Sequence, residues 1–261
     1  RYLPLLKARG AAAVIVYSHR VLVKILLTMT SMVVDADHGV SVDAFDCHCS
    51  MLSLPYLFKT TVDTIPAEVP YLRLPPKAGE RWAKALASRP GLKVGLTWAG
   101  SRHTARDRLR SVPLQEFAPL MAVPGVQFVV LQKDDESREQ MRALDWPMID
   151  WMDECDDLLD TAALVDQLDL VISVDTVIVH MAGALGKPVW LLNRYESEWR
   201  WLTEGETSPW YPSMRIFRQA AMHDWHSVIA GVAKELCKLS ATREEKRLDG
   251  GLIARVKKWF A

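Results

Sequence analysis

A strand–helix–strand pattern over residues 168–192 constrains the fold of this chain more than any other feature. The apolar run Leu168–Val174 predicts a buried strand, and the residues after it predict a helix that ends at Gly186. The run Lys187–Leu192 predicts the next strand. Strands that alternate with helices in this way form parallel sheets with helices on their faces. The sequence therefore predicts an α/β fold.

The same alternation occurs on both sides of this pattern. Because open parallel sheets bind ligands at the carboxyl ends of their strands, functional residues are expected directly after the predicted strands. Outside residues 168–192, the sequence predicts strands over 13–17, 32–34, 92–98 and 126–132. It predicts helices over 21–29, 78–87, after Pro113 and over 161–167.

A proline-rich stretch over residues 65–76 separates two groups of elements, because Pro removes a backbone donor and blocks helix continuation. We predict three parts: a domain over 1–76, a second domain over 77–240, and a tail or amphipathic helix over 241–261. Two α/β units joined by such a linker imply a cleft between them. Because a helix over 1–10 comes before any strand, we expect the first domain to be truncated at its amino terminus.

Composition excludes several classes of protein. The 261 residues carry 32 basic and 32 acidic side chains, so no net charge attracts nucleic acid or an anionic membrane. The most apolar stretch, 14–34, contains His19, Arg20 and Lys24, which a transmembrane helix would not readily tolerate. Four cysteines are too few for a disulfide scaffold, and no leader is recognised. We expect a cytoplasmic protein with no transmembrane segment.

The turn after the strand Leu168–Val174 is a candidate anion site. Asp175 is a favoured N-cap residue, and the amides of Thr176, Val177 and Ile178 would be free at the helix start, where the helix dipole favours anions. His180 lies one turn further on and could add a donor. The alternative is an ordinary capped turn with a core histidine.

A basic loop follows the strand predicted over 92–98, at the same edge of the sheet. It begins at Ser101 and includes Arg106, Arg108 and Arg110, whose guanidinium groups could hold a diphosphate by paired hydrogen bonds. A solvated basic loop without a ligand is the alternative.

Three other segments are weaker candidates for ligand contacts. Gln132 and Lys133 follow a predicted strand and could contact a nucleotide base. Asp160, beside Thr161, is expected to cap the next helix. Aromatic residues over 199–212 could stack on a ligand or pack on their own domain.

Residues 47–49, a Cys-His-Cys sequence, invite a metal hypothesis, but zinc normally needs four ligands and the remaining cysteines lack a pairing motif, so we expect no metal. Asp46 and His48 are instead possible acceptor contacts facing the cleft. No nucleophile elbow, Walker loop or dinucleotide fingerprint is present, which argues against serine hydrolases, P-loop kinases and dehydrogenases.

These segments together resemble the heptosyltransferase-like glycosyltransferases (family 9 type), in the bacterial branch where such a domain follows tetratricopeptide repeats. The resemblance covers residues 1 to about 239 and includes Gly183 within the motif that follows His180. The matching words are RYLPLL at 1–6, MLSLP at 51–55, TIPA at 64–67, PYL at 70–72, VGLTWAG at 94–100, DTAA at 160–163, VDT at 174–176, HMAGALG at 180–186, SPWYP at 208–212 and RIFRQ at 215–219.

The resemblance implies two Rossmann-like domains facing a cleft, the glycosyltransferase B type of fold. The second domain would bind a nucleotide-sugar donor, and a glycan, lipid-linked or protein acceptor would approach from the first. It implies an inverting transfer without metal or cofactor, in which Arg108 or Arg110 and the helix start at Thr176 stabilise the departing diphosphate. The donor-binding residues would be Ser101, Gln132, Lys133, Asp160, Thr161, Asp175, Thr176, Val177, His180 and Gly183.

Two departures from the family pattern keep other functions open. Val177 stands where these enzymes usually carry Gly or Ala, and the family's first strand and Gly-Asp loop, the expected source of the catalytic base, would lie before Arg1. The alternatives are a non-catalytic nucleotide-sugar-binding or scaffold domain and a sugar-nucleotide epimerase, which would need carboxylates near the sugar ring.

Overall fold

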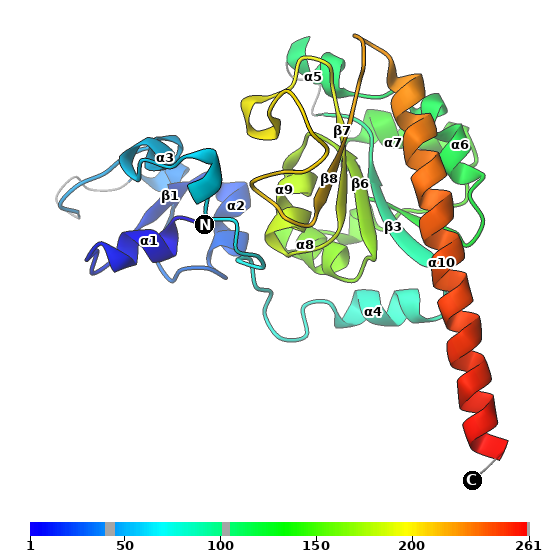
Figure 1. The fold of residues 1–261 in the computed structure, drawn as a ribbon. Coiled ribbons are helices and arrows are strands. Elements are labelled where there is room, and N and C mark those ends of the chain that lie inside the picture. Colours follow the sequence, from blue (N-terminus) through cyan, green and yellow to red (C-terminus); the bar gives the residue numbers. More distant parts are fainter. Residues whose placement is uncertain (40–44, 101–104, 260–261) are drawn as a thin grey trace.

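The computed structural model describes residues 1–39, 45–100 and 105–259, which form two units with separate sheets (Figure 1). The first and smaller unit contains a parallel strand pair with short helices around it. The second unit contains a six-stranded sheet with helices on both faces. The α/β fold with a parallel sheet that the sequence predicts is therefore confirmed.

The sheet of the large unit has the strand order β5-β4-β3-β6-β7-β8, and every neighbouring pair is parallel. This is the Rossmann order, in which the direction of winding reverses between the first and fourth strands of the unit, here β3 and β6. The strands are β3 (Leu92–Thr97), β4 (Val126–Val130), β5 (Met148–Ile149), β6 (Leu170–Val174), β7 (Val189–Asn193) and β8 (Met214–Arg218).

Helices of the large unit cover the sheet, and α10 runs along one side of it before extending beyond it (Figure 1). The helices are α4 (Glu80–Ala87), α5 (Ala105–Arg110), α6 (Ala118–Met121), α7 (Asp135–Ala143), α8 (Leu158–Asp166), α9 (Val177–Ala184) and α10 (Trp225–Trp259).

The small unit pairs β1 with β2 in parallel, with Val16 opposite Val33 and Ser18 opposite Asp35. Its elements are α1 (Leu3–Ala8), β1 (Val16–Ser18), α2 (Arg20–Leu26), β2 (Val33–Asp35) and α3 (Leu54–Leu57).

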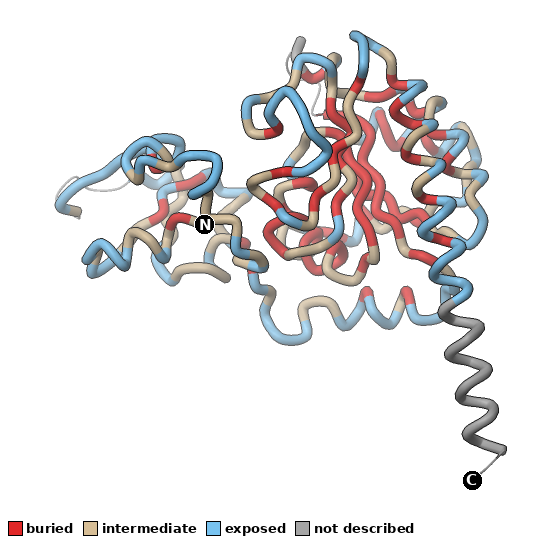
Figure 2. The backbone as a smooth tube through the Cα atoms, viewed as in Figure 1, coloured by how far each residue is buried: buried red, intermediate tan, exposed pale blue. Residues whose placement is uncertain are grey.

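Buried apolar residues concentrate in the sheet of the large unit (Figure 2). All five residues of β6 are buried, because helices cover the strand on both sides. This explains why the strand is a continuous apolar run in the sequence rather than an alternating one. The small unit contributes few buried side chains, and several of its apolar residues, including Tyr56, are exposed.

The two units meet along α2, the proline-rich linker and α9. Helix α2 packs against α8, and the Lys24 ammonium lies 2.6 Å from the Asp157 carboxylate. In the linker, the amides of Tyr71 and Leu72 both donate to the Ala184 carbonyl at the end of α9, at 3.0 and 3.1 Å. The linker is therefore attached to the same helix whose other end lies at the carboxyl edge of the sheet.

Some elements differ from the sequence predictions. Strands β5 and β8 and helix α7 were not predicted. Helix α10 continues through residue 240 without a break, where the sequence predicted a separate tail, and Ser240 still packs on the body by donating to the Pro124 carbonyl at 2.7 Å. The domain limits stay predictions. Within the described residues, no helix combines the length and the apolar character needed to cross a membrane.

Candidate functional site

The carboxyl ends of β3 and β6 bring two predicted site segments together. Gly100 follows β3 and Asp175 follows β6, and the two strands are neighbours, with Thr97 opposite Ser173 in the register. In a Rossmann sheet this point, where the winding reverses, is where ligands bind. The candidate site is therefore built around Gly100, Asp175 and the helices that follow them, α5 and α9.

Arg110, the last residue of α5, joins the two segments. One terminal nitrogen of its guanidinium donates to the Asp175 carbonyl at 2.5 Å, and the other pairs with the Asp107 carboxylate. The side chain is 28% exposed, and toward the residues that the structure describes it uses two of its five N–H donors in these contacts. The arginine is held at the sheet edge and keeps donors for an anion.

Close approach at Gly100 shapes this part of the site. A Cβ atom there would lie 2.6 Å from the Arg110 Nε atom and 3.0 Å from an Asp107 carboxylate oxygen. The Gly100 amide donates to the Ser111 hydroxyl at 3.0 Å, and that hydroxyl donates to the Asp107 carbonyl at 2.6 Å. These contacts fix the turn after β3 against the end of α5.

Helix α9 begins one residue later than the sequence predicted. Thr176, not Asp175, is the N-cap: its backbone is extended, with φ −137° and ψ 178°, and its hydroxyl accepts from the Ile178 amide at 3.3 Å. The predicted cap role of Asp175 is therefore wrong. Val177 is 47% exposed at the first helical position, so its side chain borders the space in front of the helix amides.

His180 lies on α9 against aromatic rings from two other segments. Its ring is stacked on Trp201 at a centroid distance of 5.3 Å, and its Nδ1 atom is 3.1 Å from the Tyr211 hydroxyl. Burial lowers the pKa of His180 to about 4, although the Asp175 carboxylate, 4.0 Å from Nε2, acts in the opposite direction. The imidazole is therefore neutral at pH 7.

We expect this histidine to make stability depend on pH. The unfolded chain protonates His180 near pH 6.5 and the folded chain near pH 4, so the unfolded state binds more protons between these values. The stability that the neutral ring contributes is complete above pH 6.5 and is lost as the pH falls toward 4. The Tm of the wild-type protein should therefore fall more between pH 7 and pH 4.5 than that of His180→Gln. Parallel Tm curves would contradict this.

Gly183 lies on the same helix and faces Tyr211. A Cβ atom at this position would lie 2.4 Å from the Tyr211 Cδ1 atom, and the tyrosine is only 4% exposed. In this structure Gly183 allows the ring to pack against α9, and a contact with a donor stays a prediction.

Gln132, which is buried, and Lys133, which is exposed, both form hydrogen bonds with backbone groups. The Gln132 carbonyl oxygen accepts from the Trp98 and Ala99 amides at 3.1 and 3.0 Å. The Lys133 ammonium donates to the carbonyls of Met152 and Cys155 at 2.5 and 2.8 Å. The Gln132 contacts join the ends of β3 and β4, and the Lys133 contacts join the end of β4 to the segment after β5. A base contact from either residue stays a prediction.

Asp160 does not cap α8, contrary to the prediction. The cap is Asp157, whose carboxylate accepts from the amides of Leu159 and Asp160 at 2.8 and 3.0 Å. Asp160 lies in the first turn and pairs with Arg81 at 3.1 Å. The Thr161 hydroxyl donates to the Asp157 carbonyl at 3.1 Å. Both Asp residues precede the helix core at suitable spacing, so the sequence alone did not distinguish them.

The remaining predicted residues make fewer contacts that bear on the site. Arg108 is exposed on α5, beside Arg110. Asp46 and His48 are exposed in the small unit, and the His48 ring lies edge-on to Phe45 at 5.6 Å. Ser101 lies outside the described residues. Among the described residues, no three His, Cys, Asp or Glu side chains form a group that could hold a metal ion.

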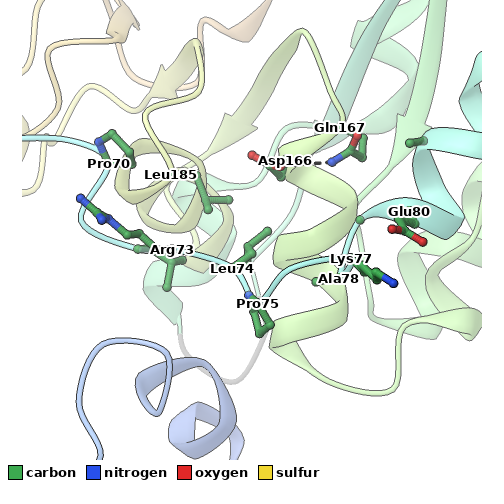
Figure 3. A pocket seen from close by; sticks show the side chains of 13 residues that line it. Pro70, Arg73, Leu74, Pro75, Lys77, Ala78, Glu80, Asp166, Gln167 and Leu185 are labelled. Atoms are coloured by element: carbon green, nitrogen blue, oxygen red, sulfur yellow. Dashed lines mark hydrogen bonds between the residues drawn. The ribbon is translucent and has the colours of Figure 1, made fainter.

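A cavity of about 450 Å³ lies away from this site, under the linker (Figure 3). Its lining includes Arg73 and Lys77 from the linker and Asp166 and Gln167 from the end of α8. Gln167 precedes β6 and Leu185 precedes β7, so the cavity borders the amino ends of the strands, opposite the candidate site.

The sequence interpretation assigned no role to Arg1 and Tyr71, which lie outside the large sheet and contact Tyr211, the partner of His180. The Arg1 guanidinium lies over the rings of Tyr71 and Tyr211, at 5.0 and 4.7 Å from their centroids, and donates to the Tyr71 hydroxyl at 3.3 Å. No local pattern connects residues so far apart in the sequence. The sequence signals were the aromatic cluster at 199–212, which contains Tyr211, and the matching words at 1–6 and 70–72, to which no role was assigned.

Comparison with known proteins relates part of this chain to one family. Residues 156–228 match the model for glycosyltransferase family 9 (heptosyltransferase), a segment that runs from the start of α8 into α10 and includes the α9 turn. Protein FlbA of Caulobacter vibrioides is 30% identical over 208 residues, which cover 77% of this chain and 34% of FlbA. This chain thus spans about a third of that relative.

Two solved structures resemble this one. The ADP-heptose LPS heptosyltransferase II of E. coli aligns with a TM-score of 0.50 and 18% identity, over 66% of this chain and 54% of that enzyme. A family 9 glycosyl transferase from Veillonella parvula aligns with a TM-score of 0.48 and 12% identity, over 80% of this chain and 57% of that one. This chain therefore resembles the heptosyltransferase II structure in its fold, and its residues 156–228 resemble glycosyltransferase family 9.

Proposed function

We propose that this chain binds a nucleoside-diphosphate sugar at the carboxyl edge of the large sheet, as part of a glycosyltransferase of the two-domain B type. The observation that carries the proposal is the contact between the Arg110 guanidinium and the Asp175 carbonyl, beside the amino end of α9. It places a cation and helix amides at the point where a Rossmann sheet binds its ligand. The match of residues 156–228 to family 9 supports the same function.

In the proposed reaction, the bond between the sugar and the diphosphate breaks and negative charge develops on the departing diphosphate. Arg110, together with Arg108, stabilises this charge by charge-assisted hydrogen bonds, and the amides at the start of α9 add to it. The Thr176 hydroxyl, which accepts from the Ile178 amide, lies at the same helix start. An acceptor hydroxyl forms the new bond to the sugar carbon on the face opposite the departing diphosphate and loses its proton to a base, so the transfer inverts this centre. The acceptor approaches from the small unit, on the side of Asp46 and His48.

Titration calorimetry with ADP, GDP and UDP tests the binding step. We expect saturable heat with at least one of them and a rise in Tm at saturating concentration, because a ligand that binds only the folded state stabilises it. Absence of heat with all three would contradict the proposal. ADP is the first choice because the heptosyltransferase II neighbour is named for an ADP sugar. Hydrolysis of ADP-heptose that is unchanged by EDTA would support a transfer without metal.

A second candidate is a non-catalytic nucleotide-sugar-binding or scaffold domain. It is favoured by Val177, whose exposed β-branched side chain narrows the space before the helix amides. If this candidate is right, we expect calorimetry to show binding of the nucleotide without hydrolysis or transfer of the sugar, both in this chain and in the Val177→Gly variant. If Val177→Gly turns over a donor and the wild-type chain does not, the side chain has blocked a competent site.

A further inference from the structure

A line of polar groups connects the small unit to the candidate site. The Arg1 guanidinium donates to the Tyr71 hydroxyl at 3.3 Å, and the Tyr71 and Tyr211 hydroxyls are 3.3 Å apart. The Tyr211 hydroxyl is 3.1 Å from His180 Nδ1, and His180 Nε2 is 4.0 Å from the Asp175 carboxylate. The Asp175 carbonyl in turn accepts from Arg110. These five residues before Arg110 are called the relay below.

The first member of the relay sets the direction of the hydrogen bonds. A guanidinium only donates, so the Tyr71 oxygen accepts from Arg1 and its proton is free to be donated to Tyr211. In the direction that this proton favours, Tyr211 donates to His180 Nδ1, a contact whose distance fits either tautomer of the ring. A nitrogen that accepts carries no proton in the neutral ring, so the proton of His180 is on Nε2, which faces Asp175.

Packing holds the middle of the relay in place. The Tyr211 ring lies against Gly183 with no room for a Cβ atom, and His180 is stacked on Trp201. The Tyr71 amide is bonded to Ala184 on the same helix. Burial raises the pKa of Tyr211 well above its ordinary value, with Tyr71 acting in the same direction, so its hydroxyl stays protonated and able to donate.

We propose that Tyr211, oriented by Tyr71 and Arg1, is a positioning residue that fixes the Nε2–H tautomer of His180 and aims this donor at the Asp175 turn. The role of this donor rests on the proposed function, since the His180 Nε2–H group would donate to a diphosphate sugar bound in front of α9. The orientation of the His180 Nε2–H group therefore depends on the position of the small unit, because Tyr211 contacts Tyr71 in the linker and Arg1 in the small unit.

Nitrogen NMR of the full chain, labelled at histidine and without ligand, tests the tautomer. We expect one ring of the wild-type protein at pH 7.5 to show an unprotonated Nδ1 and a protonated Nε2, and the His180→Gln variant to assign it. In Tyr211→Phe the two nitrogen shifts of this ring should move toward each other, because neither tautomer is fixed any longer. Tyr17→Phe, which removes a hydroxyl bonded to the Ala36 carbonyl in the small unit, is the matched control and should leave the ring unchanged. A protonated Nδ1 in the wild-type protein would overturn the inference.

Calorimetry with ADP then tests whether the relay contributes to nucleotide affinity at the candidate site. Loss of one hydrogen bond that orients a donor predicts binding about threefold to tenfold weaker in Tyr211→Phe. Tyr71→Phe should weaken it less, and the double variant should equal Tyr211→Phe, because Tyr71 acts only through Tyr211. Equal affinity in all variants, or strictly additive losses, would overturn the positioning role. If ADP, GDP and UDP all fail to bind the wild-type protein while the fixed tautomer is observed, the proposed function fails and the tautomer assignment stands.

Discussion

Arg110→Ala is expected to weaken nucleoside-diphosphate binding about 10- to 100-fold, which corresponds to about 1.5–3 kcal/mol for a hydrogen bond to a charged group. The guanidinium is the group that joins the end of α5 to the Asp175 turn, so its loss removes both the cation and this connection. Calorimetry with the nucleotide that binds the wild-type protein measures the effect. Arg110→Lys should recover part of the affinity, because an ammonium keeps the charge but lacks the paired geometry.

The matched control for this experiment is Arg20→Ala. Arg20 is exposed on α2 in the small unit, so its removal changes the net charge by the same amount without touching the sheet edge. We expect wild-type affinity in this variant. If the two alanine variants bind equally well, Arg110 does not contact the nucleotide. A Tm for each variant is needed as well, because Arg110→Ala leaves the buried Asp107 carboxylate without this partner.

Gly183→Ala is expected to destabilise the protein by about 1–3 kcal/mol through overpacking. The added Cβ atom would lie 2.4 Å from Cδ1 and 2.5 Å from Cγ of Tyr211, atoms of a rigid and buried ring that cannot move aside without disturbing its contact with His180. Urea unfolding measures the change in the free energy of unfolding. The variant should also lose affinity for the nucleotide, because the displaced ring no longer orients His180.

Gly231→Ala is the control substitution for Gly183→Ala. Gly231 lies inside α10, and a Cβ atom there meets nothing within 4 Å. Alanine at an open helical position should stabilise the protein by about 0.5–1 kcal/mol, because glycine costs more backbone entropy in a helix. Opposite signs at the two positions would show that the close contact, not the loss of glycine as such, causes the effect. Equal signs would contradict the packing argument.

The central part of the fold could be predicted because burial on both faces leaves a clear pattern. Strands β6 and β7 are nearly continuous apolar runs, and the helix between them ends at a glycine, Gly186, with φ 73°. Strand β8 was not predicted because it lies at the sheet edge and carries Arg215 and Arg218. Strand β5 has only two residues, too few to give a periodic pattern.

The candidate site could be predicted where it depends on strand ends and not where it depends on distant contacts. The ends of β3 and β6 meet because the strands are neighbours, so the proximity of Arg110 and Asp175 follows from the topology. The cap of α9 was misplaced by one residue because Asp and Thr are both favoured caps. The relay was missed because Tyr71 and Tyr211 are 140 residues apart. Their pairing depends on the path of the linker back to α9, and this path cannot be inferred from the spacing of nearby residues in the sequence.

The uneven burial of the two units implies that their backbones unfold locally at different rates. The β1–β2 pair has only two strands of three residues each, and such a pair has little stability without packing against other elements. We therefore expect amide hydrogens of residues 16–18 and 33–35 to exchange with deuterium much faster than those of β6. Exchange in the small unit would then report on how long α2 and the linker stay attached to the large unit.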